Sequence, residues 1–320
     1  MNITILGSGR WASYIAWYLH SIHHQVLLWG RKDSKRFQAL KDQRSNEYLA
    51  LDSSIHLTDS LQEALDYSDT IIIAIASQGL RTLAKEMNSV LTQKKTFVLA
   101  MKGLEKSTGK RLSMIMEEEI PQPKKLAVWV GPTQVEDALQ GTPNCMIIAS
   151  DHMDVARELV QSFSSSTLRL YVGLDVIGSE IGAALKNVIG IIAGMLDGLH
   201  LSSLKGALMA RGTLEVSRLV ETLGGKKETI YGLSHLGDYE ATLFSKFSHN
   251  RAFGEAFIRH ETYPYLAEGY DTTEAVYHLA KSYQVSMPII EAAYAVLFQK
   301  QDPYQMLQQL LIRESKEEFA

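Results

Sequence analysis

The sequence has few of the features that mark a secreted, disordered or fibrous protein. It contains one cysteine, Cys145, among 320 residues, and only 7 prolines and 22 glycines. A single cysteine cannot form an internal disulfide, which is typical of a chain made for a reducing compartment. Hydrophobic residues make up 46% and charged residues 21% of the chain, as in ordinary globular proteins. We therefore expect a soluble protein of the cytoplasm, with about two domains for this length.

The chain also lacks an excess of positive charge. It has 32 Lys and Arg against 36 Asp and Glu, a formal net charge of −4. Without a basic field, nothing concentrates the protein on nucleic acid or on an anionic membrane surface. We expect neither to be a partner.

No long hydrophobic run is free of polar groups. The most apolar stretch, residues 177–199, holds Glu180, Lys186, Asn187 and Asp197, which a span facing lipid would not tolerate. At the N-terminus, Met1 leads directly into a short apolar run and glycines, without the basic region of a secretory signal. We expect no membrane insertion and no secretion.

Metal-binding patterns are equally scarce. No Cys and His residues have the spacing of a zinc site. His20 and His24 are four apart, but they fall where a predicted helix ends, and a cation is favoured there without any metal. We expect no metal.

What the sequence does contain changes character once, near Gly173. Before it, short apolar runs alternate with helical stretches: Ile3–Leu6, Val26–Trp29, Thr70–Ile75, Thr96–Ala100, Leu126–Val130, Met146–Ala149 and Leu168–Val172. Runs that are apolar throughout indicate strands covered on both faces, and their alternation with helices predicts a doubly wound, mostly parallel α/β sheet. After Gly173, long stretches with helical spacing such as Ala207–Leu223 and Pro288–Leu297 replace them. We predict an N-terminal Rossmann domain over residues 1–173 and an all-helical domain over residues 174–320.

A glycine motif follows the first predicted strand. Residues Gly7-Ser8-Gly9-Arg10-Trp11-Ala12 match the G-x-G-x-x-[G/A] pattern and lead into an apolar helix. In this context Gly7 permits a tight turn, Gly9 lets a pyrophosphate approach the backbone, and the phosphates lie on the helix N-terminus. The motif predicts a dinucleotide site.

The end of the second predicted strand bears on which dinucleotide is bound. An NAD enzyme usually has Asp or Glu there, for the ribose 2′-hydroxyl, but this chain has Trp29-Gly30-Arg31-Lys32. A guanidinium suits a 2′-phosphate, so Arg31 favours NADP(H), with NAD(H) possible. The alternative is that Arg31 is a solvated surface residue and Asp33 contacts the ribose.

One predicted helix carries a lysine on a glycine-rich side. Gly178, Gly182, Gly190 and Gly194 recur at multiples of four residues, and Lys186 takes the middle place. Each glycine costs a helix about 1 kcal/mol, so backbone or ligand must approach this side closely. A lysine among apolar residues, with no acid four residues away, is a candidate for an amine whose pKa is lowered for proton transfer. The alternative is a lysine whose head reaches water while the glycines pack on a neighbouring helix.

Together these motifs resemble the bacterial-type NAD(P)-dependent glycerol-3-phosphate dehydrogenases. The resemblance runs in order over nearly the whole chain and is carried by Gly7–Ala12, Trp29-Gly30-Arg31, Lys102-Gly103-Leu104-Glu105, Gly131-Pro132-Thr133, Ala184-Leu185-Lys186-Asn187-Val188, Asp197-Gly198, Arg211-Gly212, Leu236-Gly237-Asp238, Ser248-His249-Asn250-Arg251, Glu268-Gly269 and Met287-Pro288-Ile289. It implies a helical second domain like that of 6-phosphogluconate dehydrogenase. It also implies hydride transfer between a nicotinamide and C2 of sn-glycerol 3-phosphate, in cells mainly to supply phospholipid synthesis.

The resemblance also assigns roles to residues of this chain. Lys186 matches the proton donor and acceptor, and Lys102 matches the lysine that touches substrate and cofactor. The implied substrate contacts are Lys102, Gly131, Thr133, Lys186, Asp238, Ser248, His249 and Asn250. The implied cofactor contacts are Gly7, Ser8, Gly9, Arg10, Trp11, Arg31, Lys102, Val135, His249 and Glu268. The expected ligands are thus a small phosphate-bearing substrate and a nicotinamide dinucleotide, and we expect a homodimer.

The chain departs from the family pattern at a few of these places. Ser248-His249-Asn250 replaces the usual Ser-Arg-Asn, so an imidazole stands where a permanent cation is common. Ala76-Ser77-Gln78 replaces the usual Pro-Ser/Ala-His, and Val130 precedes Gly131 where Ser is usual. Two other functions remain open: a 3-hydroxyacid dehydrogenase of the same two-domain plan, and a dinucleotide-binding sensor without catalysis.

Overall fold

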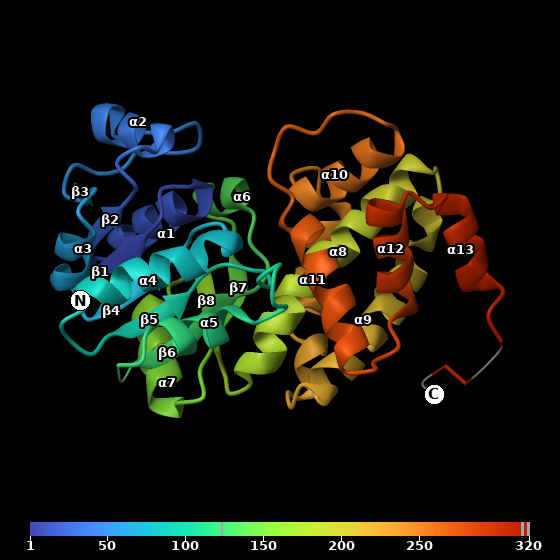
Figure 1. Cartoon of the computed structure of the whole chain (residues 1–320). Coiled ribbons are helices and arrows are strands. Elements are labelled where there is room, and N and C mark those ends of the chain that lie inside the picture. The colour runs from blue at the N-terminus through green and yellow to red at the C-terminus, as the bar shows by residue number, and fades with distance from the viewer. Residues whose placement is uncertain (123, 315–316, 319–320) are drawn as a thin grey trace. The chain divides into compact units, whose positions relative to one another are not determined.

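The computed structural model describes residues 1–122, 124–314 and 317–318 of the chain. The chain forms two compact units, and each is described by itself (Figure 1). The first consists of Met1–Met101 and Leu112–Val176, and the second of Lys102–Arg111 and Ile177–Ala320. The sequence places the division at Gly173 and gives no sign that residues 102–111 lie with the helical part.

An eight-stranded sheet forms the middle of the first unit. Its strands are β1 (Asn2–Leu6), β2 (Gln25–Trp29), β3 (His56–Thr58), β4 (Thr70–Ile73), β5 (Thr96–Leu99), β6 (Lys125–Val130), β7 (Asn144–Ala149) and β8 (Leu168–Gly173). Their order is β3-β2-β1-β4-β5-β6-β7-β8, and every neighbouring pair is parallel except β6 with β7. This confirms the predicted doubly wound, mostly parallel sheet. The three-residue β3 was not predicted, because a run that short gives no periodic signal, and β4 ends at Ile73 rather than Ile75.

Helices cover both faces of this sheet, as the uninterrupted apolar runs require. They are α1 (Arg10–Ser21), α2 (Lys35–Gln43), α3 (Leu61–Tyr67), α4 (Leu80–Val90), α5 (Leu112–Glu119), α6 (Val135–Leu139) and α7 (Met153–Phe163). Alternate residues of a strand enter different cores: Ile5 packs in a cluster with residues of α1 and α7, whereas Leu6 packs with residues of α3, α4 and α5. The glycine loop therefore follows a strand that is buried from Ile3 to Leu6.

The second unit is helical, as predicted. Its main helices are α8 (Val176–Gly198), α9 (Lys205–Thr222), α10 (His249–Ile258), α11 (Glu268–Ser282), α12 (Pro288–Gln299) and α13 (Pro303–Leu311). Short helical turns at Leu236–Asp238 and Glu240–Phe244 connect α9 to α10. The core of this unit gathers residues of α8, α9, α11 and α12, together with Leu104 from the 102–111 segment.

Helix α8 lies in the interior of the second unit. It is long and apolar enough to cross a membrane, but 89% of its most apolar window is buried in the folded chain, as in the core helix of a globular protein. Its glycines allow close packing: a Cβ built on Gly194 would overlap the carbonyl oxygen of Arg251, and one on Gly254 of α10 would overlap that of Ile191. The protein's own backbone is therefore what approaches this part of the glycine-rich side.

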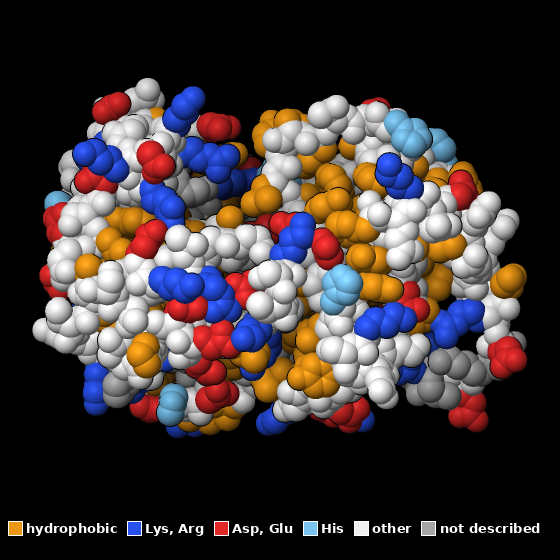
Figure 2. All heavy atoms as spheres, in the orientation of Figure 1, with side chains coloured by type: hydrophobic (Ala, Val, Ile, Leu, Met, Phe, Trp, Pro, Cys, Tyr) orange, Lys and Arg blue, Asp and Glu red, His pale blue; other side chains and the backbone are white. Residues whose placement is uncertain are grey.

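The surface carries charges of both signs. Figure 2 shows acidic and basic side chains interspersed on the visible face of each unit, with hydrophobic side chains more frequent on the second. Tyr265 and Leu266 between α10 and α11 are 63% and 61% exposed.

Candidate active site

The glycine loop of the first unit has the shape that a bound pyrophosphate needs. Gly7 has φ +137°, and a Cβ on it would overlap the carbonyl oxygen of Ala74, so only glycine fits this turn. In contrast, no atom of a described residue lies within 4 Å of a Cβ built on Gly9. Gly9 is the N-cap residue of α1, and the described residues provide neither a side-chain cap nor an acid in the first turn of this helix. The N–H groups at this helix end thus face open space, which suits an anion.

Arg10 and Trp11 follow at the start of α1. The guanidinium of Arg10 pairs with the Glu136 carboxylate and lies 4.8 Å from the centre of the Tyr48 ring. Burial lowers the pKa of Arg10 from its usual value. Trp11 stacks on Tyr14, with 5.3 Å between ring centres. Both side chains are thus held by the protein beside the glycine loop.

Arg31 lies just beyond the C-terminal end of β2. Its side chain is 48% exposed, and Nη2 lies 3.5 Å from Oε1 of Glu86. At this distance and exposure the pair is weak, so an incoming phosphate can compete for the guanidinium. Asp33, the alternative contact, is also exposed.

The other candidate residues of this unit follow β6. Gly131 comes directly after the strand, the Thr133 hydroxyl lies 2.9 Å from the Met146 sulfur, and the buried Val135 begins α6. Because β6 and β1 run in the same direction through the sheet, these residues lie at the same edge of the sheet as the glycine loop.

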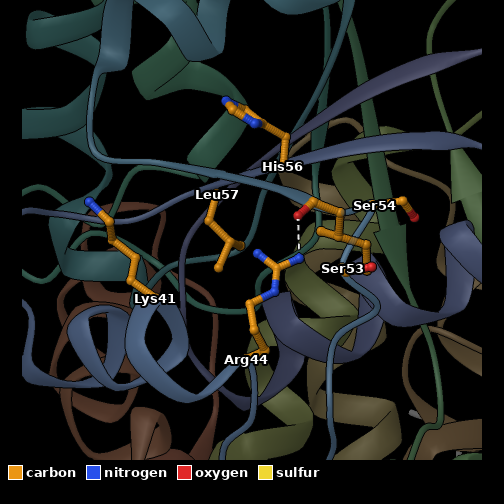
Figure 3. Close-up of a pocket in the computed structure, with 7 residues that line it drawn as sticks. Lys41, Arg44, Ser53, Ser54, His56 and Leu57 are labelled. Atoms are coloured by element: carbon orange, nitrogen blue, oxygen red, sulfur yellow. Dashed lines mark hydrogen bonds between the residues drawn. The ribbon is translucent and has the colours of Figure 1, made fainter.

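A pocket of about 280 Å³ opens elsewhere in the first unit, beside edge strand β3 (Figure 3). Residues 53–57 line it at the start of the strand, which is the opposite edge of the sheet from the glycine loop. Arg44 donates a hydrogen bond to the Ile55 carbonyl at 2.6 Å, drawn in Figure 3, and Lys41 pairs with Asp59 at 3.0 Å. This pocket is separate from the predicted dinucleotide site.

Two lysines and an aspartate meet in the second unit. Lys186 of α8 and Lys102 both bind Oδ2 of Asp238, with Nζ–O distances of 3.1 Å and 2.7 Å. Lys186 also donates to the Thr242 hydroxyl at 2.7 Å, and that hydroxyl donates to the Asp238 carbonyl at 2.7 Å. We call Lys102, Lys186, Asp238 and Thr242 the lysine cluster. No acid lies four residues from Lys186 on α8, and its carboxylate partner comes instead from a segment about fifty residues further along the chain.

The surroundings of Lys186 change its protonation. Its side chain is only 10% exposed, and burial lowers its pKa to about 8. The Asp238 carboxylate opposes this effect and the positive charge of Lys102 adds to it. An ammonium with this pKa can both give and take a proton near neutral pH. The structure thus favours the desolvated amine over a lysine that reaches out to water.

Asp238 keeps one oxygen for another partner. The residue is 1% exposed, and its Oδ1 accepts no hydrogen bond from any residue that the structure describes. A buried carboxylate oxygen without a donor costs about 1–3 kcal/mol or more. This cost makes Oδ1 of Asp238 a candidate acceptor for a ligand hydroxyl.

A buried histidine lies beneath the cluster. Nδ1 of His235 lies 2.8 Å from the Gly182 carbonyl, and Nε2 lies 2.6 Å from the Tyr239 hydroxyl, which accepts from Thr213 at 3.2 Å. Burial lowers the pKa of His235 to about 4, so the ring is neutral and donates from Nδ1. Gly182 is one helical turn before Lys186, so this ring joins the Lys186 helix to the turn that carries Asp238.

The predicted run 248–251 forms the start of α10. Ser248 caps this helix, the Nδ1 of His249 lies 2.6 Å from the Tyr263 hydroxyl, and Oδ1 of Asn250 accepts from the backbone N–H of Gly269 at 2.9 Å. Glu268 begins α11 beside Gly269. Arg251 points elsewhere: Nη1 lies 2.8 Å from Asp197 and 3.0 Å from Glu255.

The start of α10 lies close to the lysine cluster. A Cβ built on Gly190, one turn after Lys186, would lie 2.7 Å from Cγ2 of Thr242 and 3.4 Å from Cβ of Asn250. The structure thus brings Lys102, Lys186 and Asp238 into direct contact and places Asn250 beside them. Among the described residues, no group of three His, Cys, Asp or Glu side chains could hold a metal ion.

Sequence comparison matches both parts of the chain to one family. The profile described as NAD-dependent glycerol-3-phosphate dehydrogenase N-terminus matches residues 2–156, and the C-terminus profile matches residues 175–308. A protein of an Exiguobacterium species, named glycerol-3-phosphate dehydrogenase, NAD(P)+, is 36% identical over 99% of this chain and 97% of its own length. The chain belongs to the NAD-dependent glycerol-3-phosphate dehydrogenase family. A Bacillus pumilus protein of the same name is 35% identical over 98% of this chain and 94% of its own.

Solved structures agree with membership of the glycerol-3-phosphate dehydrogenase family. The glycerol-3-phosphate dehydrogenase of Coxiella burnetii superposes with a TM-score of 0.91 at 28% identity, covering 98% of this chain and 99% of that one. The Plasmodium falciparum enzyme, at 19% identity, shares the fold with a TM-score of 0.88 over 99% of this chain and 97% of its own. The family assignment favours the first of the three functions that the sequence left open, and it makes the protein an enzyme that uses a nicotinamide cofactor.

One residue of the lysine cluster and two residues beside it were not predicted from the sequence. Thr242 follows Asp238 by four residues, and this spacing, which places both on one side of a helical turn, is the one signal that could have identified it. His235 and Tyr239 have the same spacing, but a lone buried histidine gives no pattern of its own.

Proposed function

We propose that this protein catalyses the reversible reduction of dihydroxyacetone phosphate to sn-glycerol 3-phosphate by NAD(P)H. Membership of the family supports the reaction. The observation that carries the proposal is the buried Lys186 ammonium, bound to Asp238 at 3.1 Å and with its pKa lowered to about 8. A carbonyl that accepts hydride needs a proton donor of this kind beside its oxygen.

The glycine loop fits the dinucleotide. The open space before Gly9 and the free N-terminal end of α1 suit a pyrophosphate. We assign cofactor contacts to Gly7, Ser8, Gly9, Arg10, Trp11, Arg31, Lys102, Val135, His249 and Glu268. When bound, the nicotinamide supplies the hydride that adds to C2 of the substrate.

Lys186 is assigned as the proton donor in the reduction. An ammonium has three hydrogens, and the residues that the structure describes accept two of them, through Asp238 and Thr242. The third is available to the carbonyl oxygen at C2. That oxygen takes the proton as the carbon gains the hydride, and Lys186 becomes a neutral amine, which takes back a proton from water before the next turnover.

Lys102 and Asp238 prepare this step. The Lys102 charge stabilises the oxygen while it is still negative, and it makes Lys186 a stronger acid. The Asp238 carboxylate holds both ammonium groups through Oδ2, and Oδ1 is left to accept a hydroxyl of the substrate.

The substrate phosphate is assigned to the start of α10. Ser248 caps this ten-residue helix, whose N-terminus favours an anion. The Asn250 oxygen is taken by Gly269, so its NH₂ group is the part left for a ligand. We assign substrate contacts to Lys102, Gly131, Thr133, Lys186, Asp238, Ser248, His249 and Asn250.

We infer that NADP(H) is preferred over NAD(H). Arg31 is exposed and only weakly paired with Glu86, and a charge-assisted hydrogen bond to a 2′-phosphate contributes about 1.5–3 kcal/mol. The test is the ratio of KM for NADH to KM for NADPH. It should fall at least about tenfold in Arg31→Ala, and an unchanged ratio would overturn the assignment.

The setting of the reaction is also proposed. We place the enzyme in the cytoplasm, where its product supplies phospholipid synthesis, and we propose a homodimer. Sedimentation equilibrium measures the mass directly, and a single species with the mass of one chain at micromolar concentration would contradict the dimer.

The reaction is tested by the loss of NADPH absorbance with dihydroxyacetone phosphate. Wild type should turn over, and Lys186→Met should lose turnover while binding NADPH as before. Lys95→Met is the control, because it removes another buried lysine away from the cluster and should keep its kcat. Wild type without turnover, or full activity in Lys186→Met, would refute the proposal.

A further inference from the structure

The segment Lys102–Arg111, which we call the strap, belongs to the second unit although the chain enters and leaves it from the first. Met101 and Leu112 are both part of the first unit. The strap carries Lys102, whose ammonium is bound to Asp238 at 2.7 Å. The contacts that attach the strap to the second unit therefore also hold Lys102 in position.

Part of this attachment is apolar. Leu104 is 0% exposed and belongs to the same buried cluster as Ile181, Leu185 and Val276. Leu104 also pairs with Arg111 in an antiparallel bridge, so the strap is a closed hairpin. Because of this bridge, the backbone of Arg111 lies opposite Leu104, which is two residues after Lys102.

The charged attachments differ in burial. Arg111 binds Glu180 with an Nη1–Oε2 distance of 2.6 Å, and their side chains are 17% and 5% exposed. Lys106 lies 3.2 Å from both Asp271 and Glu274, but its side chain is 45% exposed. Exposed pairs contribute little because water screens their charges, whereas loss of one partner from a buried pair leaves an uncompensated charge. The Arg111–Glu180 pair is therefore the stronger charged anchor.

We propose that Arg111 and Glu180 are positioning residues for the reaction: their ion pair holds the strap so that Lys102 stays on Asp238. Glu180 lies on α8, six residues before Lys186. One helix thus carries the proton donor and also anchors the segment that carries the second lysine. This inference rests on the proposed function, because its first measurement is the reduction of dihydroxyacetone phosphate.

The position of Lys102 has an electrostatic readout. Its charge lowers the pKa of Lys186, in addition to the effect of burial. If the strap loosens, Lys102 moves away from Asp238 and the pKa of Lys186 rises. The pH at which kcat of the reduction falls to half then moves upward. A change that merely unfolds part of the enzyme lowers the amount of active protein but does not move this midpoint.

The test uses Arg111→Gln and Glu180→Gln in the full-length enzyme. We expect each to lower kcat about tenfold and to raise the pH midpoint. Lys102→Met should raise the midpoint in the same direction, because it removes the same charge. The double variant should fall no further than the single ones, since both remove one interaction.

Two further variants separate positioning from folding. Arg111→Lys keeps the charge and should recover most of the kcat that Arg111→Gln loses. Lys281→Gln breaks an exposed pair of the same unit, Lys281 with Glu291 at 3.1 Å, and should match wild type. If Glu180→Gln does not fold, Arg111→Gln carries the test, because its side chain is partly exposed.

The outcomes distinguish this inference from the proposed function. If wild type is active and Arg111→Gln keeps its kcat and pH midpoint, the positioning role is overturned and the proposed function stands. If wild type does not reduce dihydroxyacetone phosphate, the proposed function fails. An NMR titration of the Lys186 amine in wild type and Arg111→Gln then decides the inference, since the same upward shift in pKa is expected, and equal titration curves would refute it.

Discussion

Replacement of Asp238 by asparagine gives the sharpest check on how the lysine cluster works. Asp238→Asn keeps the size of the side chain but removes the charge that lies 3.1 Å from the Lys186 amine. Burial and Lys102 then act on Lys186 without opposition from the carboxylate. We expect the pKa of Lys186 to fall below about 8, so that the reduction loses activity at a lower pH than in wild type.

The structure sets the size of this effect. The fall in pKa of Lys186 from 10.5 to about 8 corresponds to about 3 kcal/mol. At 3.1 Å and an effective dielectric constant of about 20, the attraction to Asp238 is on the order of 5 kcal/mol. Loss of even a third of this attraction lowers the pKa of Lys186 from about 8 to below about 7. At about pH 8 the protonated fraction of Lys186 then falls from about one half to about one twentieth.

The assay is kcat for the reduction of dihydroxyacetone phosphate between about pH 6 and pH 9. Wild type should lose half of its kcat near pH 8, and Asp238→Asn should do so at least one pH unit lower. Thr242→Val is the control, because it removes an uncharged partner of Lys186 and should lower kcat without a shift of that size. An unchanged or higher midpoint in Asp238→Asn would refute the electrostatic argument.

The remaining predictions concern binding and stability. Gly9→Ala should fold as wild type but bind NADPH at least about tenfold more weakly. Gly7→Ala should instead lower the melting temperature, because its Cβ would overlap the backbone of Ala74. Equal NADPH binding by Gly9→Ala and wild type would refute the pyrophosphate site. Burial raises the pKa of Glu215 from 4.5 to about 7. Ionisation of this buried carboxyl therefore lowers the free energy of unfolding as pH rises from about 4.5 to 7. Relative to Glu215→Gln, wild type should lose on the order of 3 kcal/mol over that range in urea unfolding; a difference that is constant with pH would contradict this. Gly194→Ala should destabilise the protein by several kcal/mol, while Gly206→Ala, in open helical surroundings, should stabilise it by up to about 1 kcal/mol; the same melting temperature for both would refute the close helix packing.

The sequence predicts the fold where the signal is local. Seven of the eight strands were predicted from short apolar runs, because burial on both faces of the sheet favours apolar residues. Edge strand β8 departs from this rule, since Arg169 and Tyr171 are exposed. The three residues of β3 form a strand only because β2 lies beside them, and no local pattern shows this. Membership of 102–111 in the helical unit is likewise decided by where Leu104 packs, far from its neighbours in the sequence.

The candidate active site shows the same contrast between features with a local sequence signal and features that depend on distant contacts. Lys186 stands out because it interrupts a glycine pattern, and the resemblance to a family pointed to Lys102 and Asp238. Their mutual contacts join residues 52 or more positions apart, and the shared oxygen of Asp238 becomes visible only in three dimensions. His235 was not predicted, because its function in the fold depends on a carbonyl of another helix.

The discontinuity of the second unit has a consequence for synthesis of the protein. A ribosome makes residues 102–111 before any of the helices on which they lie, and Leu104 has no core to enter until α8 and α11 have followed. The first unit meanwhile obtains all its strands by Gly173. A fragment that begins at Ile177 lacks Leu104, which packs in the core of the second unit, and Lys102, one of the two lysines that bind Asp238. The helical unit therefore needs a segment that the ribosome makes within the N-terminal part of the chain.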